Sequence, residues 1–340
     1  MKKVALENAI GLRLGHDLTE INVINKTKRR AYKRGHIITV DDLDRLRDLG
    51  KNYIFVFTGN QNEVHEDTAA LEVAPLIAGE NIKFDPEPSE GKISFYATCD
   101  GLLKVDSNRL FQINALEIPS LPTLHSNLPV KTGKQVAAFR IIPLFCQSDM
   151  IEKIKSKLKI PLIDVKPFLF KKAGIIVTGN EVFEGRIKDA FIPKISRILK
   201  QYDVDVVIEE ILPDQKTKIS EAIKIFSKAC EIIFVTGGTS VDPDDQTVAA
   251  LEDAGVKFNV KGNPIQPGNN FTVGYKGNTV VCAVPAAAIF YKATALDVFL
   301  PRLLAGEKIQ KEDFFNAGHG GLCHFCEKCH FPNCPFAVTN

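Results

Sequence analysis

The sequence lacks an excess of charge of either sign. Its 43 lysine and arginine residues are nearly balanced by 41 aspartate and glutamate residues, which leaves a formal net charge of +2. Proteins that bind nucleic acid or anionic membranes through long-range electrostatics usually carry a large positive surplus. The composition therefore gives no support for either partner, and we expect neither nucleic acid nor membrane among the ligands.

The sequence also lacks a run of apolar residues long enough to cross a bilayer. The longest such run, residues 279–291, is too short and contains Pro285. Near the N-terminus, Glu7, Asn8 and Arg13 interrupt any apolar stretch that could act as a signal peptide. Together these absences predict a soluble cytoplasmic protein.

The eight cysteines fall into two groups. Four stand alone in apolar or strand-like surroundings and are expected to be small buried hydrophobic residues: Cys99, Cys146, Cys230 and Cys282. The other four lie together in one short C-terminal segment: Cys323, Cys326, Cys329 and Cys334. In a chain with no export signal, this crowding predicts a metal site before it predicts disulfides.

The spacing of this second group, Cys-x2-Cys-x2-Cys-x4-Cys-Pro, can bring four thiolates to one point. Four thiolates suit either Zn²⁺ or an iron–sulfur cluster. The ferredoxin run is similar but one residue shorter before its last cysteine, so the cluster is favoured only slightly. A tail that is redox-labile or binds no metal stays open as an alternative. His319, His324 and His330 are substitute ligands, although a solvated or supporting role suits each better.

At 340 residues the chain is long enough for two or three domains. Shifts in composition predict a mixed α/β domain over residues 1–80, a β-rich domain over 81–165, an α/β domain over 166–305 and a cysteine-rich metal-binding tail over 306–340. No strand of the α/β domain is predicted beyond residue 305. Removing the residues after Asn316 is therefore expected to leave its sheet folded.

Apolar strands alternate with helical segments from Lys171 onward. The predicted strands cover residues 173–177, 204–209, 232–235 and 280–284, and the predicted helices cover 191–201, 219–228, 247–253 and 286–299. This order predicts a three-layer α/β domain, with a mostly parallel sheet and helices on both faces. Ligands of such sheets bind beyond the C-terminal strand ends. Three polar turns are expected to converge there: Thr178–Glu181, Leu212–Asp214 and the turn after Thr236.

The turn after Thr236 carries the clearest chemistry. Gly237 and Gly238 end a buried strand, three aspartates follow, and a helix is predicted from Thr247. Backbone N–H groups at such a turn can hold phosphate oxygens. Aspartates there fit best if a divalent cation lies between carboxylate and phosphate. The simpler alternative is a tight turn with solvated acidic side chains.

These motifs together resemble the molybdenum-cofactor-synthesis domain of molybdopterin adenylyltransferases and molybdopterin molybdenumtransferases. The resemblance rests on Thr236-Gly237-Gly238-Thr239 with Asp245 and Thr247, on Thr178-Gly179-Asn180-Glu181, on Gly185–Asp189, on Leu212-Pro213-Asp214 and on Asn263–Asn269. It covers roughly residues 171–305. Residues 9–18 and 35–38 are similar, more weakly, to parts of the molybdenumtransferases.

The resemblance implies a Mg²⁺-dependent enzyme of molybdenum cofactor assembly that acts on molybdopterin, or its adenylylated form, and on molybdate. Asp245 and Asp214 are the implied catalytic residues, and Asp245 with Glu181 the implied Mg²⁺ ligands. The implied substrate-binding residues are Thr178, Gly179, Glu181, Gly237, Gly238, Thr239, Ser240, Thr247, Pro267 and Gly268. The family also implies a homo-oligomer, either a dimer or a trimer.

Two departures from the family pattern leave other functions open. Val284-Pro285-Ala286 replaces a Pro-Gly turn, and Gln266 stands where a basic residue is common. A non-catalytic molybdopterin carrier or sensor, with the cysteine tail as its redox or delivery element, is the main alternative. A nucleotide-processing enzyme that binds pyridine nucleotides and ignores molybdate is a weaker one.

Overall fold

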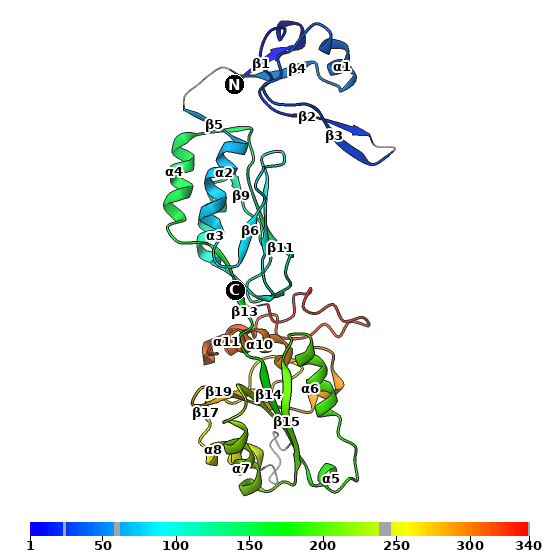
Figure 1. The fold of residues 1–340 in the computed structure, drawn as a ribbon, viewed down its shortest axis with the longest axis vertical. Coiled ribbons are helices and arrows are strands. Elements are labelled where there is room, and N and C mark those ends of the chain that lie inside the picture. The colour runs from blue at the N-terminus through cyan, green and yellow to red at the C-terminus, as the bar shows by residue number, and fades with distance from the viewer. Residues whose placement is uncertain (23–24, 58–61, 238–245, 339–340) are drawn as a thin grey trace. The chain divides into compact units, whose positions relative to one another are not determined.

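A computed structural model describes residues 1–22, 25–57, 62–237 and 246–338 (Figure 1). The chain divides into two compact units whose segments interleave along the sequence. The first contains Met1–Tyr96, Asp106–Thr123 and Gln135–Ile163, and the second contains Ala97–Val105, Leu124–Lys134 and Asp164–Asn340. Residues 81–165, predicted to be one β-rich domain, therefore contribute to both units.

The N-terminal part of the first unit is small and built around two antiparallel strand pairs. Its elements are β1 (Lys2–Ala5), a 3₁₀ turn (Leu6–Asn8), β2 (Leu18–Asn22), β3 (Thr27–Tyr32), α1 (Asp42–Asp48) and β4 (Tyr53–Val56). β1 pairs with β4 and β2 with β3. Leu14, Leu46 and Ile54 are almost completely buried in a shared core. This part of the chain therefore contains both strands and a helix.

The rest of the first unit is a four-stranded sheet with helices beside it (Figure 1). Its sheet has the order β6 (Ile82–Phe84), β7 (Ile93–Ala97), β11 (Gln135–Ile141), β9 (Pro119–Ser120), and a further pair joins β5 (Glu63–His65) to β12 (Phe145–Gln147). The helices are α2 (Glu66–Ile77), α3 (Ser107–Asn114) and α4 (Ser148–Lys157). Asp106 caps α3 by accepting a hydrogen bond from the Arg109 N–H.

The second unit contains the predicted α/β sheet. Its strand order is β15 (Asp205–Leu212), β14 (Lys172–Thr178), β16 (Ile232–Thr236), β19 (Thr279–Val284), β18 (Thr272–Lys276), β17 (Lys257–Val260). The first four strands are parallel to one another. β18 runs antiparallel to β19, and β17 runs antiparallel to β18. A smaller sheet has the order β10 (Pro129–Val130), β8 (Gly101–Val105), β13 (Ile163–Pro167). The mostly parallel sheet is as predicted.

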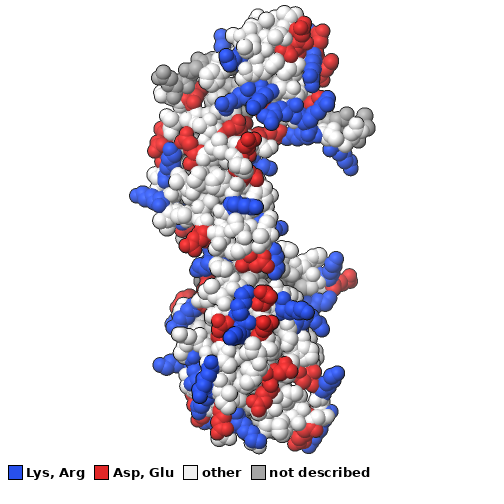
Figure 2. Space-filling view, in the orientation of Figure 1, with Lys and Arg blue, Asp and Glu red and all other residues white. Residues whose placement is uncertain are grey.

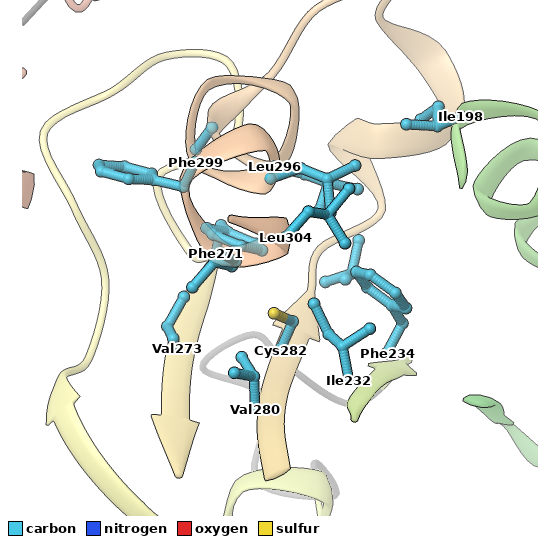
Figure 3. Packing of buried hydrophobic residues seen from close by; sticks show 14 of the residues in the cluster. Ile198, Ile232, Phe234, Phe271, Val273, Val280, Cys282, Leu296, Phe299 and Leu304 are labelled. Carbon is cyan, nitrogen blue, oxygen red and sulfur yellow. The ribbon is translucent and has the colours of Figure 1, made fainter. Parts of the chain in front are cut away.

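Helices cover both faces of this sheet, and successive side chains of each strand point to opposite faces. Ile232 and Phe234 of β16 pack into one core with helices α6 (Phe191–Lys200) and α10 (Ala295–Leu304) (Figure 3). Ile233 and Val235 pack into a second core with α7 (Lys216–Phe226) and α8 (Thr247–Asp253). Every side chain of β16 is therefore buried, as expected for an internal parallel strand.

The helix predicted over residues 286–299 is wrong in one respect, because the structure has two helices there. α9 (Ala287–Phe290) is short, and α10 begins only at Ala295. Thr294 starts the second helix with a capping box, in which its backbone N–H and its hydroxyl both donate to Asp297 Oδ2, at 2.8 and 3.0 Å. These bonds satisfy the Thr294 N–H at the helix start, whereas in a continuous helix this N–H would donate to a carbonyl oxygen of the preceding turn.

The cysteine-rich tail packs into the core of the second unit. After α11 (Lys311–Asn316), the chain places Phe336 and Ala337 in the same core as α10, where they are 3% and 4% exposed. Removing the residues after Asn316 would uncover this core. This burial argues against the expectation that the sheet stays folded without the tail, because core packing as well as strand number determines what a sheet requires.

Charged side chains of both signs are interspersed on the face shown in Figure 2, consistent with the balanced composition. No helix among the described residues is long and apolar enough to span a membrane. A partly buried charge cluster lies inside the second unit. There Glu307 accepts a hydrogen bond from Arg302 Nε at 2.8 Å and lies 2.9 Å from Lys104 Nζ.

We predict that this cluster makes stability depend on acid pH. Burial raises the pKa of Glu307, but the hydrogen bonds from Arg302 and Lys104 outweigh it and lower the pKa from 4.5 to about 2. The lowered pKa stabilises the fold above about pH 4.5, and this contribution is lost as the pH falls through 2. It amounts to at most about 3 kcal/mol. Urea unfolding from pH 5 to 2 should show a smaller loss for Glu307→Gln than for the wild type, and equal losses would contradict the assignment.

Candidate active site at the C-terminal strand ends

The parallel register brings three separate turns to one edge of the sheet. Thr178 at the end of β14 is opposite Leu212 of β15, and Val177 is opposite Thr236 of β16. Thr236 is in turn opposite Val284 of β19. The turns that follow these strands therefore begin side by side, which confirms the convergence predicted from the strand order.

Asn180 and Asp214 join the first two turns through a reciprocal pair of hydrogen bonds. The Asn180 N–H donates to Asp214 Oδ2 at 3.2 Å, and the Asp214 N–H donates to Asn180 Oδ1 at 3.1 Å. The second carboxylate oxygen, Asp214 Oδ1, is buried and has no hydrogen-bond partner in the described part of the chain. An anchored carboxylate with one buried, unpaired oxygen is a strong candidate for binding a cation or a proton donor.

Sequence reasoning identified Asp214 but did not assign a role to Asn180. Its position directly after Gly179, at the end of a buried strand, was the available signal. Its reciprocal partner could not be seen, because the pairing depends on the register of two strands that are far apart in the sequence.

Three buried threonines form the base of this edge. The Thr178 hydroxyl donates to the Thr236 carbonyl oxygen at 3.1 Å. Since its only proton is used there, the 3.1 Å contact between Thr178 Oγ1 and Thr247 Oγ1 has Thr247 as donor. Thr247 begins α8, so the two bonds tie β14, β16 and α8 together. Thr236 Oγ1 is buried and has no partner among the described residues.

We predict that Thr247→Val lowers the free energy of unfolding by about 1–2 kcal/mol, because Thr178 Oγ1 loses a buried donor. Thr247→Ser retains the hydroxyl and should be less destabilised. Chemical denaturation of the three proteins measures the difference. A serine variant as unstable as the valine variant would mean that packing, and not the hydrogen bond, is responsible.

Glycine is required at two positions of this edge. Gly237 has φ +84°, and a Cβ there would lie 2.1 Å from the Thr178 carbonyl oxygen. At Gly179, a Cβ would lie 2.8 Å from Glu181 Oε1, which places the exposed Glu181 carboxylate against this turn. Gly237 was expected to admit a ligand. In the structure, a Cβ at Gly237 would instead meet the backbone of the adjacent strand, β14.

The Pro-Gly loop packs against the start of α10. Pro267 and Gly268 are both buried, and the Ala295 N–H donates to the Pro267 carbonyl oxygen at 3.1 Å. Asn263 holds the loop from within by donating to the carbonyl oxygens of Gly268 and Phe271 at 3.1 and 2.9 Å. No hydrogen bond between described residues joins this loop to Thr178, Asn180 or Asp214.

Several predicted site residues lie outside the described part of the chain: Gly238, Thr239, Ser240 and Asp245. Among the residues that are described, no group of three or more His, Cys, Asp and Glu side chains is already arranged to hold a metal ion. Glu181 and Asp214 make only two groups, because Asp245, the third carboxylate expected beside them, lies outside the described residues. The four tail cysteines are described and form no such group. Those cysteines are free thiols that line one common pocket.

The sequence is similar to known proteins in two separate stretches. Residues 174–305 match the profile of a family described as "Probable molybdopterin binding domain", and residues 3–58 match one described as a domain of unknown function, DUF8806. The first stretch contains the strand-end site, whereas the second lies in the first unit.

Curated proteins resemble only part of this chain. A molybdopterin molybdenumtransferase of Haemophilus influenzae is 26% identical over 160 residues, which are 44% of this chain and 39% of that protein. A CinA-like protein of Amoebophilus asiaticus is 37% identical over 78 residues, 23% of this chain and 19% of that protein. The chain thus spans well under half of the length of either relative.

Solved structures give a further, weaker similarity. The molybdopterin biosynthesis Mog protein of Mycobacterium ulcerans superposes with a TM-score of 0.34 at 20% identity, over 39% of this chain and 94% of that one.

Proposed function

We propose, from the premise that residues 174–305 belong to the molybdopterin-binding domain family of molybdenum cofactor biosynthesis, that this chain is a Mg²⁺-dependent, molybdopterin molybdenumtransferase-like enzyme of the cytoplasm. Its substrates are molybdopterin, or adenylylated molybdopterin, and molybdate. It works as a homo-oligomer, a dimer or a trimer.

The observation that carries this proposal is the free oxygen of Asp214. The carboxylate is held in place through Oδ2 by the Asn180 N–H, while Oδ1 is buried and unpaired. Mg²⁺ prefers carboxylate oxygens and is usually held by one or two of them together with substrate phosphates. The Asp214 carboxylate therefore fits this ion, and we propose Glu181 and Asp245 as its further ligands, although Asp245 lies outside the described residues.

The chain's own contribution is to position charge rather than to attack the substrate. Bound Mg²⁺ neutralises phosphate charge and polarises the phosphoanhydride. Asn180 fixes the Asp214 carboxylate, and the hydroxyl bonds of Thr178 and Thr247 fix the strand ends from which the turns begin. Backbone N–H groups of the Gly237-Gly238 turn would face the phosphates. Such prearranged groups lower the barrier without reorganising during the reaction.

The test is the release of AMP from adenylylated molybdopterin. Purified protein with Mg²⁺ should release AMP in proportion to enzyme, and the release should require molybdate. Chelation of Mg²⁺ should abolish it. Tight binding of molybdopterin without AMP release would identify a carrier or sensor instead, which the Val284-Pro285-Ala286 turn favours because it lacks the family's glycine.

A second candidate function is the nucleotide-processing enzyme that the sequence leaves open, and the match to a CinA-like protein at 37% identity shows that the similarity is not limited to proteins named for molybdopterin. In it, the same edge of the sheet binds a pyridine nucleotide. Hydrolysis of a pyridine nucleotide that is unaffected by molybdate would support this function and contradict the first.

A further inference from the structure

We propose that the four tail cysteines hold one thiolate-ligated metal centre, a single Zn²⁺ or a single iron–sulfur cluster, and that loading this centre stabilises the Pro-Gly loop. The centre is separate from the Mg²⁺ site at the strand ends. Both parts of the proposal rest on contacts within the second unit.

The four cysteines share one hollow, which we call the tail pocket. It has a volume of about 490 Å³ and is lined by Cys323, Cys326, Cys329 and Cys334, together with aromatic side chains such as Tyr291 and Phe325. The rings of Tyr291 and Phe325 pack 5.8 Å apart. These rings give the hollow an apolar wall, and the apolar surroundings of a metal–thiolate site tune its properties.

The first cysteine already has the local geometry of a ligand turn. Phe325 adopts φ +53°, and its N–H donates to Cys323 Sγ at 3.4 Å. Left-handed backbone at a bulky residue is uncommon and persists only where the surroundings impose it. An amide that donates to sulfur stabilises a metal-bound thiolate, and such bonds orient and tune the ligands of cysteine sites.

The tail thiols also differ from the other cysteines of the chain. Cys146, Cys230 and Cys282 are buried, and burial raises the pKa of the Cys146 thiol to about 11. Such thiols are inert towards metals. None of the four in the tail pocket is fully buried, and Cys326 is exposed. They therefore remain accessible to a metal ion.

The charge balance of the hollow suits a bound centre. Four thiolates around Zn²⁺, or around a cluster core of charge +2, carry a net charge of −2. Lys292 lines the same pocket and supplies a positive side chain. Each thiol gives its proton to solvent as its sulfur bonds to the metal, so zinc loading releases up to four protons and transfers no electrons.

No three of the thiols are yet close enough to share a metal, so the segment must contract on loading. Its two ends are already fixed. The Cys323 N–H donates to the Gln266 carbonyl oxygen at 2.8 Å, the Gln266 N–H donates to Gly321 at 2.8 Å, and the Ala337 N–H donates to Gly320 at 2.9 Å. Because both ends are held, the contraction is confined to the segment between Cys323 and Ala337.

The same bonds connect the centre to the Pro-Gly loop. Gln266 directly precedes Pro267, and both of its backbone groups bond to the tail. Unfolding of the tail would break this two-bond bridge and release the loop on that side. A centre that orders the tail therefore also stabilises the loop through this bridge, and this coupling is reciprocal.

Metal analysis of protein purified without oxygen tests the site. We expect about one zinc per chain, or about four iron and four sulfide per chain with visible charge-transfer absorption; the first identifies zinc and the second a cluster. Cys326→Ser changes an exposed side chain and should lose most of the metal. Cys99→Ser, outside the tail, should retain it, as should Asp214→Asn at the strand ends.

Amide hydrogen exchange tests the connection to the loop. Removing the metal should speed exchange at the N–H groups of Cys323 and Gln266 at least tenfold, while the β16 amides stay protected. Metal retained by Cys326→Ser at the wild-type ratio would overturn the site. So would metal-free wild-type protein with all four thiols open to alkylation, even after incubation with Zn²⁺ or with iron and sulfide. Unchanged exchange at Gln266 in loaded and metal-free protein would overturn the connection.

Discussion

Asp214→Asn is expected to lower Mg²⁺-dependent AMP release by about 100-fold or more while leaving the fold intact. An asparagine side chain can still accept the Asn180 N–H, so the reciprocal pair survives. The amide lacks the negative charge, and its second polar atom can no longer bind a cation where the buried Oδ1 stood. Initial rates over a range of Mg²⁺ concentrations measure the effect.

Asp205→Asn is the matched control for this experiment. Asp205 lies at the start of the same strand, β15, and is exposed at the N-terminal end of the strand, away from the site. It should leave both the rate and the Mg²⁺ dependence unchanged. If Asp214→Asn reaches the wild-type rate at saturating Mg²⁺, with unchanged affinity by calorimetry, Asp214 is no ligand and the unpaired oxygen has another explanation.

Gly237→Ala should destabilise the second unit more than any other single change at the site. The substitution places a methyl group 2.1 Å from the Thr178 carbonyl oxygen, so the backbone of two strands must separate. It also forces alanine into the left-handed region at φ +84°. We expect a loss of roughly 2–4 kcal/mol, which lowers the melting temperature by roughly 5–15 °C for a domain of this size.

The control for this change separates conformational strain from the collision. Gly255 has the same φ of +84°, and a Cβ there would meet only the end of the Lys276 side chain, at 3.6 Å. Gly255→Ala should therefore cost only the strain, about 1–2 kcal/mol. Equal losses in the two variants would show that the neighbouring strand moves aside without cost.

Much of the α/β domain could be predicted because its signals are local. Helix α8 has the predicted bounds, Thr247–Asp253, and β19 differs by one residue at its start. Buried parallel strands are nearly all apolar, and the helices between them repeat with a helical period, so each element can be identified from its own residues. The convergence of three turns then follows from strand direction alone.

The rest depended on contacts between distant residues. Strands β17 and β18 were missed, since the first contains Lys257 and Asn259 and has no continuous apolar run. The burial of Phe336 could not be inferred, because it depends on a core that the tail forms together with helix α10. The bonds between Asn180 and Asp214 depend on strand register, and register is a property of the folded sheet.

The interleaving of the two units has a consequence for how the chain folds during its synthesis. Leu102 and Phe336 are buried in one core, 0% and 3% exposed, yet more than two hundred residues separate them in the sequence. A ribosome that adds roughly 5–20 residues per second needs roughly ten to fifty seconds between them. Until Phe336 emerges, Leu102 and its neighbours in β8 lack part of their packing. The nascent chain must therefore keep apolar surface exposed for that interval, and such surface is prone to aggregation unless a chaperone covers it.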